Sequence, residues 1–244
     1  MCCTADMTPW VLRMRWLDLC FMHWEVPPGA VQATLPPGVK VDTRAGHAYV
    51  AAVPFRMEDV APRLVPAVPG LSAFPELNLR TYVTVNGEPG VWFYSLDVTQ
   101  PLAAALARTF FHLPYRQARM WVDRSGDVTR YASVRTDLRT GPGAFAGAYR
   151  PTGPVLDPDP NSLEAWVTDR LLLFSADAAG RVYRGRIHHV PWPLRAAQAD
   201  IRVNTLGHGL GFDLSGPPHL LHAERLDVTA WWREPLRLPA RKQG

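Results

Sequence analysis

The chain has 244 residues, of which 47% are apolar and 20% charged, so it can bury a core and is neither a disordered tail nor a disulfide-stapled miniprotein. Its net charge of +4 comes from 26 basic and 22 acidic residues without a long run of like charges, so no nucleic-acid partner is expected. Three cysteines in no disulfide or zinc spacing, and the lack of a run of about 18 apolar residues, indicate a cytoplasmic protein without a membrane segment.

The first half of the chain predicts three strands and a helix. The run His47–Met57 is rich in β-branched, aromatic and small apolar residues and predicts a largely buried strand. Two strand-like runs, Asn78–Val85 and Val91–Val98, are joined by turn-forming residues 86–90, which favours a hairpin. The stretch Gln100–His112 has a proline near its start, an alanine-rich centre and a Leu-Pro stop, and therefore predicts a helix.

The second half continues the pattern of hairpins. We expect a second hairpin over Ala118–Arg135 and then an irregular Gly/Pro-rich excursion over Thr140–Pro160. Asn161 with Glu164 is a capping-box-like start for a helix that runs to about Arg170. Three further strands are predicted at Leu171–Ser175, Arg181–Val190 and Leu220–Trp232. An irregular Gly-rich region, Gly207–Pro218, precedes the last of them.

These elements predict one β-rich α+β domain. Strands outnumber helices by about eight to two or three, most connections resemble hairpins, and no βαβ unit repeats. We expect a mostly antiparallel, barrel-like domain over residues 10–234, with residues 1–9 and 235–244 as terminal tails.

Six motifs occur between Trp10 and Trp232, and in chain order they are Phe21–Trp24, Leu35–Gly38, Phe74–Val83, Gly90–Asp97, Leu113–Tyr115 and His188–Leu194. Together they resemble the YqjF-like family of uncharacterised proteins, which is similar to a branch of the acetoacetate decarboxylase-like superfamily. The resemblance implies a cone-shaped, mostly antiparallel β-barrel-like fold with a pocket in its interior.

The catalytic residues of the decarboxylases carry over only in part. The resemblance implies a site like that of those enzymes, in which one lysine forms a Schiff base with the keto group and a second lysine lowers the pKa of the first. Glutamates and an arginine shape the site. The glutamate before the long hairpin falls on Glu76, but the lysine pair falls on Tyr115 and Arg116. The alignment puts the site arginine at Glu25 and the second glutamate at Val53.

The chain has two lysines, Lys40 and Lys242, and both are expected to face water. A Schiff base requires an amine that can lose its proton near neutral pH, which an arginine guanidinium does not do. We therefore expect no imine chemistry.

The strand that begins at Phe74 has one polar and one apolar face. Side chains alternate along a strand, so Glu76, Asn78 and Arg80 share a face, while Leu77 and its alternate neighbours share the other. If the apolar face packs outward under helices and loops, the polar face lines the barrel interior, as the resemblance favours. The alternatives are that the polar face meets solvent, or that its charges form an internal salt-bridge network.

In an interior pocket these side chains have distinct chemical roles. Arg80 would clamp an anion, because its planar fork pairs with a carboxylate through two hydrogen bonds. Burial would raise the pKa of Glu76 toward the range that a general acid or base needs. Tyr115 would donate a hydrogen bond to a substrate carbonyl, or simply pack.

The candidate site thus has two catalytic residues, Glu76 and Tyr115, and six ligand-binding residues, namely Arg80, Asn78, Arg116, His23, Tyr94 and His188. For Arg116 a solvated surface charge is the stronger alternative, and for His23 a core histidine with a satisfied hydrogen bond. His188 and His189 are adjacent on a predicted strand, so at most one of them faces the pocket. Neither this pair nor the other histidines form a metal-ligand pattern, and we expect neither a metal nor another cofactor.

Three functions remain open. The first is a pocket protein that binds a small carboxylate or keto-acid-like ligand, with Glu76 available for acid–base chemistry of a lyase or hydrolase-like enzyme without an imine. The alternative is a non-catalytic ligand-binding or sensing protein that keeps the barrel without the decarboxylase lysines. The third is a scaffold whose exposed aromatic residues mediate self-association as a homo-oligomer.

Overall fold

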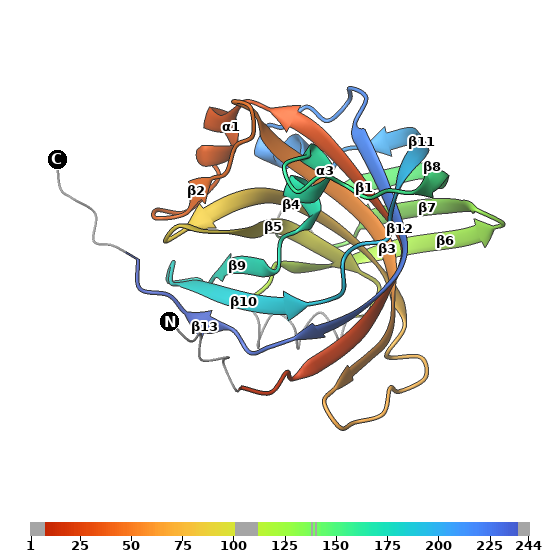
Figure 1. Cartoon of the computed structure of the whole chain (residues 1–244), viewed down its shortest axis with the longest axis horizontal. Coiled ribbons are helices and arrows are strands. Elements are labelled where there is room, and N and C mark those ends of the chain that lie inside the picture. The colour runs from red at the N-terminus through yellow and green to blue at the C-terminus, as the bar shows by residue number, and fades with distance from the viewer. Residues whose placement is uncertain (1–7, 101–111, 138, 140, 239–244) are drawn as a thin grey trace.

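A computed structural model describes residues 8–100, 112–137, 139 and 141–238. These residues form one 13-stranded, largely antiparallel sheet with two short α-helices and a 3-10 helix (Figure 1). The strands are β1 (Leu12–Val26), β2 (Lys40–Val41), β3 (Ala48–Pro62), β4 (Phe74–Val85), β5 (Glu88–Val98), β6 (Tyr115–Ser125), β7 (Val128–Arg135), β8 (Ala144–Val155), β9 (Leu172–Ala176), β10 (Val182–His188), β11 (Leu194–Asn204), β12 (His219–Ala230) and β13 (Glu234–Pro235). The helices are α1 (Pro28–Gln32), α3 (Leu163–Thr168) and η2 (His208–Leu210).

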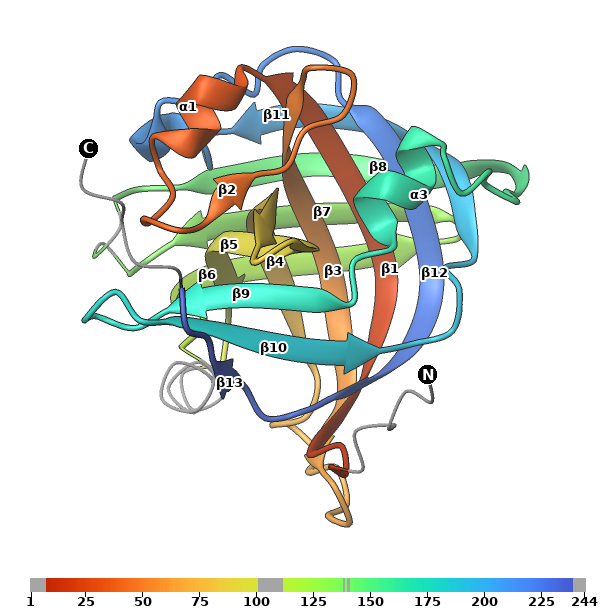
Figure 2. The ribbon, with the colours of Figure 1, turned by 60° about the vertical axis from the view of Figure 1, so that its left-hand side comes forward.

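The sheet closes into two rings. The strands β12, β1, β3, β4 and β5 belong to both rings and form the wall that the rings share. One ring has nine strands, in the order β5-β6-β7-β8-β11-β12-β1-β3-β4, and the other has seven, in the order β5-β9-β10-β12-β1-β3-β4. The rings arise because two strands fork: β5 pairs with β9 near its start and with β6 at its end, and β12 pairs first with β11 and then with β10. Figure 2 shows β9 and β10 in front of β1 and β3, and β6, β7 and β8 behind them.

The shared wall is buried on both faces, which explains its continuous apolar runs. The first eight residues of β3 are all buried. Tyr49 and Ala51 pack in the core of the seven-stranded ring, whereas Val50 and Ala52 pack in the core of the nine-stranded ring. The predicted buried strand His47–Met57 is thereby confirmed, and its lack of polar alternation follows from having two interiors to fill.

Most of the predicted strands are confirmed. The structure contains both hairpins, β4–β5 and β6–β7, the pair β9–β10 and the last long strand β12. The first hairpin turns on Asn86 and Gly87 alone, not on residues 86–90. Both have positive φ, 52° and 85°, as a two-residue turn between right-twisted strands requires.

The irregular excursion predicted over Thr140–Pro160 is wrong, because β8 occupies most of it. Glycine and proline are typical of loops, but here Gly147 permits close packing: a Cβ on it would lie 2.7 Å from the carbonyl oxygen of Asp200 on β11. The strands β1 and β11 were not predicted. In β1 both faces are buried over most of its second half, so it has no simple alternation.

The predicted helix Gln100–His112 falls mainly on residues 101–111, outside the described residues. The predicted helix after Asn161 is α3, but its N-cap is Ser162, whose Oγ accepts a hydrogen bond from the backbone N–H of Ala165 at 3.1 Å. No helix within the described ranges has the length and apolar character needed to cross a membrane.

The fork in β5 predicts a strong effect of a small substitution. A Cβ at Gly90 would lie 2.6 Å from the Phe174 ring and 2.7 Å from the carbonyl oxygen of Leu172, both on β9. We expect Gly90→Ala to lower the free energy of unfolding by about 1–3 kcal/mol, measured by urea denaturation, because the methyl group forces β9 away from β5. The control is Gly29→Ala in α1, because a Cβ at Gly29 would have no other part of the protein within 4 Å. The free energy of unfolding of this variant should be unchanged or slightly higher. Equal unfolding midpoints for Gly90→Ala and the unmodified chain would contradict this close approach.

Candidate functional site

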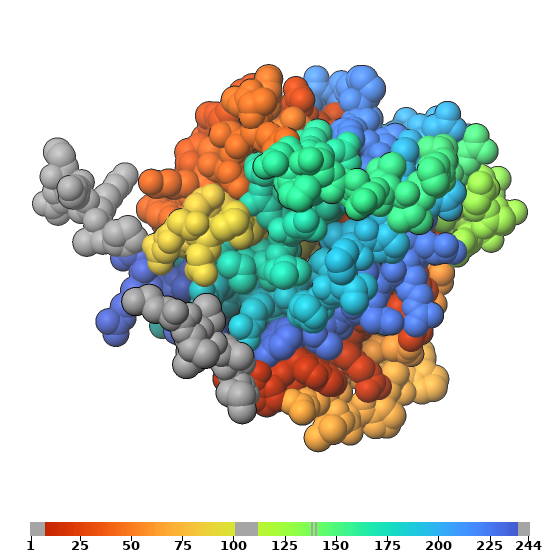
Figure 3. All heavy atoms as spheres, viewed as in Figure 1, coloured from red at the N-terminus to blue at the C-terminus, as the bar shows by residue number. Residues whose placement is uncertain are grey.

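The seven-stranded ring encloses a cavity of about 620 Å³. Its walls come from β1, β3, β4, β5 and β10, and the segment between β3 and β4 lies at one end. Figure 3 shows that the atoms of α3 and of the segment that follows it lie across this side of the molecule, over the barrel. The volume is within the range of roughly 300–1,000 Å³ that is typical of pockets for small organic ligands.

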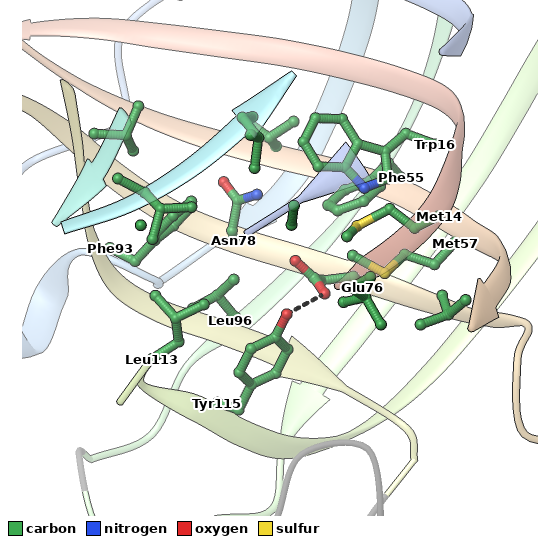
Figure 4. Close-up of a pocket in the computed structure, with 18 of the residues that line it drawn as sticks. Met14, Trp16, Phe55, Met57, Glu76, Asn78, Phe93, Leu96, Leu113 and Tyr115 are labelled. Carbon is green, nitrogen blue, oxygen red and sulfur yellow. Dashed lines mark hydrogen bonds between the residues drawn. The ribbon is translucent and has the colours of Figure 1, made fainter. Parts of the chain in front are cut away.

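Four of the eight predicted site residues line this cavity. Glu76, Asn78 and Arg80 come from alternate positions of β4, and Tyr115 comes from the start of β6. Figure 4 shows Glu76, Asn78 and Tyr115 in the cavity lining. We expected the opposite face of β4 to pack outward under helices and loops, but it does not. Leu77 and its neighbour two residues on are 1% exposed and fill the core of the nine-stranded ring, because β4 belongs to the shared wall.

Glu76 and Tyr115 form a hydrogen-bonded pair inside the cavity. The Tyr115 hydroxyl donates to Oε2 of Glu76 at 3.2 Å, and Glu76 is 1% exposed. Burial raises the pKa of Glu76 to about 8, and the negative charge of Asp97 adds to this effect while the hydrogen bond from Tyr115 opposes it. Burial also raises the pKa of Tyr115 well above 10, so its hydroxyl stays a donor. A carboxyl group that releases its proton near pH 8 is suited to acid–base catalysis.

Arg80 is a cation without an acidic partner among the residues that the structure describes. Its Nη2 donates to the Tyr82 hydroxyl at 3.3 Å, and its guanidinium lies 5.2 Å from the centroid of the Phe21 ring. Its Nε is buried and makes no hydrogen bond. In contrast, Arg170, which also lines the cavity, is paired with Asp42 at 2.7 Å. Arg80 therefore has N–H groups available for an anion.

Two further polar groups of the lining have no hydrogen-bond partner among the residues that the structure describes. The side chain of Asn78 is 5% exposed, and its Oδ1 has no hydrogen bond within the described part of the chain. The indole Nε1 of Trp16 is in the same state. Unsatisfied buried polar groups are costly and uncommon, and one explanation for them is a ligand that supplies the partners.

Trp16 was not among the predicted site residues. The alternation of Met14 and Trp16 on one face of β1 is a signal for it, but the strand changes phase at Asp18, whose φ is +53°. After this irregularity Leu19 and Phe21 face the same cavity, so no single period of two runs through the strand.

His23 lies next to the cavity lining, on the same face of β1 as Phe21, and its contact with Arg80 runs through Tyr82. Its Nε2 is 2.7 Å from the Tyr82 hydroxyl. Because Arg80 donates to that hydroxyl oxygen, the hydroxyl proton is directed to His23 Nε2, which accepts. Burial, together with the charge of Arg80, lowers the pKa of His23 well below 6.5, so the ring is neutral. His23 is thus a core histidine that orients Tyr82 and, through it, Arg80.

The structure does not place Tyr94 at the cavity. The pairing of β4 with β5 shifts register between Leu79 and Arg80, which leaves Tyr94 as the extra residue of β5. As a result Phe93 faces the cavity, and the Tyr94 hydroxyl lies 2.7 Å from that of Thr34 on the other side of the sheet.

Arg116 and His188 also lie outside the cavity lining. Arg116 follows Tyr115 on β6, so its side chain leaves on the opposite face, where Nη1 donates to the carbonyl oxygen of Tyr115 at 3.3 Å. His188 is exposed at the end of β10 and borders a separate surface hollow together with His189. Neither histidine faces the large cavity, and no group of three or more potential metal ligands occurs in the described ranges.

The remaining positions are the two aligned with the second glutamate and the arginine of the decarboxylases, and the two lysines. Val53 lines the cavity, whereas Glu25 is exposed and accepts a hydrogen bond from Tyr49 at 3.0 Å. Lys40 is exposed on β2, and Lys242 lies outside the described residues. No lysine is present in the described lining of the cavity.

Comparison with known proteins confirms the family resemblance. Residues 13–227 match the protein family DUF2071, whose description is "Uncharacterized conserved protein". The protein YqjF of Bacillus subtilis (strain 168) is 41% identical over 229 residues, which are 93% of this chain and 92% of that protein.

Solved structures confirm the acetoacetate decarboxylase-like fold. The enduracididine biosynthesis enzyme MppR, complexed with the condensation product of pyruvate and imidazole 4-carboxaldehyde, has a TM-score of 0.68 at 14% identity and covers 95% of this chain and 91% of its own. Acetoacetate decarboxylase from Legionella pneumophila has a TM-score of 0.68 at 13% identity and covers 96% and 93%, respectively. At these identities the similarity concerns the fold alone.

The buried carboxyl group predicts how stability depends on pH. The folded protein binds the Glu76 proton with a pKa of about 8 and the unfolded chain with one of about 4.5, so folding loses stability as pH rises between these values. We expect Glu76→Gln to match the unmodified chain near pH 5 and to be more stable near pH 9, by up to about 5 kcal/mol, in urea unfolding. The exposed Glu25→Gln is the control and should keep the original pH dependence. Parallel pH profiles for Glu76→Gln and Glu25→Gln would contradict the raised pKa.

Proposed function

The chain belongs to the DUF2071 family of uncharacterised conserved proteins, and we propose that it binds a small carboxylate or keto acid inside the seven-stranded ring. Arg80 holds the carboxylate of the ligand, Asn78 contacts its polar atoms, and the Glu76–Tyr115 pair transfers a proton.

The observation that carries this proposal is the guanidinium of Arg80, which has no acidic partner among the described residues and lines a mainly apolar cavity. The Arg80 side chain is half-buried and its Nε is buried without a hydrogen bond, so a bound carboxylate would both neutralise the charge and accept two parallel hydrogen bonds. The free Oδ1 of Asn78, two residues along the same face of β4, accepts a hydrogen bond from a hydroxyl or enol group of the same ligand.

The spacing of the two charged residues defines how a ligand would lie. Glu76 and Arg80 are separated by four residues of a strand, or roughly 13 Å between Cα atoms, and a ligand that spans their side chains brings its carbonyl group to Tyr115. The Tyr115 hydroxyl then donates a hydrogen bond to the carbonyl oxygen. Ionised Glu76 takes a proton from the adjacent carbon, and the resulting enolate takes a proton back from Glu76 when the carbonyl re-forms.

The class of ligand is supported by one of the structural relatives. MppR, which shares the fold, is complexed with pyruvate in a further solved structure with a TM-score of 0.66. Pyruvate combines a carboxylate with a keto group, which are the two groups that Arg80 and the Glu76–Tyr115 pair would recognise.

A second candidate function is ligand binding without catalysis. It is favoured by the cavity lining, in which the position of the catalytic lysine is taken by Tyr115 and no other lysine occurs among the described lining residues. A protein of this kind would use Arg80 in the same way and would leave the ligand unchanged.

Binding of the carboxylate is tested by removing the charge of Arg80. We expect pyruvate, acetoacetate and 2-oxobutanoate to raise the melting temperature of the unmodified protein, and Arg80→Gln to weaken binding by at least about tenfold, because a hydrogen bond to a charged group is lost. Arg119→Gln is the matched control, since Arg119 is exposed on β6 and outside the cavity. Equal stabilisation of the Arg80 and Arg119 variants by the same acids would remove Arg80 from the binding role.

Proton transfer is tested by isotope exchange. In D₂O we expect the protein to catalyse deuterium incorporation at the carbon beside the keto group of a bound keto acid, followed by NMR. Glu76→Gln should lower this rate at least about 100-fold while the acid still binds, and Tyr115→Phe should lower it less. Binding without any exchange in the unmodified protein would establish the non-catalytic alternative.

A further inference from the structure

The cavity is much larger than a three- or four-carbon acid and is lined mainly by apolar side chains. Besides the polar residues of β4, the lining includes Met14, Trp16, Phe55 and Met57 on one side of Glu76, and Phe93, Leu96 and Leu113 on the other (Figure 4). A volume of about 620 Å³ is enough for a drug-sized molecule. A short keto acid would leave most of this apolar surface in contact with water, and burial of that surface is favourable only if the ligand itself is apolar.

Polarity changes along the length of the cavity. The face of β4 presents Phe74, Glu76, Asn78 and Arg80 in this order, and six residues of strand place Phe74 and Arg80 roughly 20 Å apart. The Arg80 end is polar: Arg170, from the segment after α3, lies beside the same Tyr82 ring that Arg80 contacts. The carboxylate of a ligand therefore belongs at the Arg80 end.

The Phe74 end is apolar and opens to solvent. Met57 pairs with Phe74 across β3 and β4, and Val60 and Pro62 of β3 continue the lining in the same direction. Beyond them, the loop of residues 63–73 contributes four lining residues that also face solvent. They are Pro66 and, with exposed fractions of 44%, 47% and 47%, Val65, Val68 and Leu71. A cluster of exposed apolar side chains at the mouth of a cavity is typical of a site that binds an apolar group.

We propose that the ligand is an amphipathic carboxylic acid with a medium-length apolar chain. Its carboxylate lies at Arg80, its reactive carbon near Glu76, and its chain extends past Met57 to the rim at Val65. This inference rests on the proposed function, because it requires Arg80 to hold a carboxylate. It adds that the apolar chain supplies most of the affinity.

The test is calorimetric titration with butanoate, octanoate and dodecanoate below their micelle concentrations, with 1-octanol as the uncharged analogue. Each buried methylene gives about a fourfold gain in affinity, so octanoate should bind at least tenfold more tightly than butanoate. Arg80→Gln should weaken binding of all three acids, and octanoate should bind more tightly than 1-octanol.

Two variants test where the chain lies. Val60→Trp and, independently, Met14→Trp fill the apolar end, so each should remove the advantage of dodecanoate over butanoate and leave butanoate binding unchanged. Val134→Trp is the control, because Val134 is exposed on β7 and outside the cavity lining, and it should behave as the unmodified chain.

The possible failures are distinct. If the three acids bind with equal affinity and Arg80→Gln weakens all of them, the proposed function stands and the amphipathic ligand is overturned. If 1-octanol binds as tightly as octanoate, or if Arg80→Gln has no effect, the carboxylate role of Arg80 is overturned, and the proposed function falls with this inference.

Discussion

The wall that the two rings share is the constraint on which the rest of the structure depends. Because β5 and β12 each pair with two further strands besides their neighbour in the wall, the strands between them have an interior on both faces. Most side chains of β3 and β4 therefore face one of two cores, and the two charged residues of β4, Glu76 and Arg80, share the face toward the seven-stranded ring. This arrangement directs Glu76, Asn78 and Arg80 into one chamber and Leu77 into the core of the other ring.

The two faces of the wall treat charge differently. On the side of the nine-stranded ring, Asp97 is fully buried and is paired with Arg135 at 3.1 Å, which satisfies both charges. On the side of the seven-stranded ring, Glu76 has a single tyrosine hydroxyl as its partner and Arg80 has no carboxylate among the described residues. Asp97 and Arg135 neutralise each other, whereas the charge of Arg80 beside the cavity would gain a partner from a bound anion.

The fold of the decarboxylases is present without their amine. The family shares the barrel with acetoacetate decarboxylase, yet Tyr115 stands where the resemblance implies the nucleophile. Tyrosine has no amine and therefore cannot form a Schiff base. Burial raises the pKa of Tyr115 well above 10, so its hydroxyl keeps the proton and stays a hydrogen-bond donor. The chamber therefore combines the fold of the decarboxylases with a tyrosine hydroxyl and a buried carboxyl group in place of an amine.

The sequence by itself determined the features that depend on residues close together along the chain. The alternation of β4 placed Glu76, Asn78 and Arg80 on one face, the turn residues located the hairpins, and the scarcity of lysine disfavoured an imine. Only the tertiary structure decided which interior each face meets, because ring closure joins residues as distant as Leu12 and Ala230. It also decided the irregularities at Asp18 and Tyr94, where an extra residue reverses the order of the two faces. Such a change of phase is fixed by pairing across the sheet, so a periodic pattern read along one strand does not contain it.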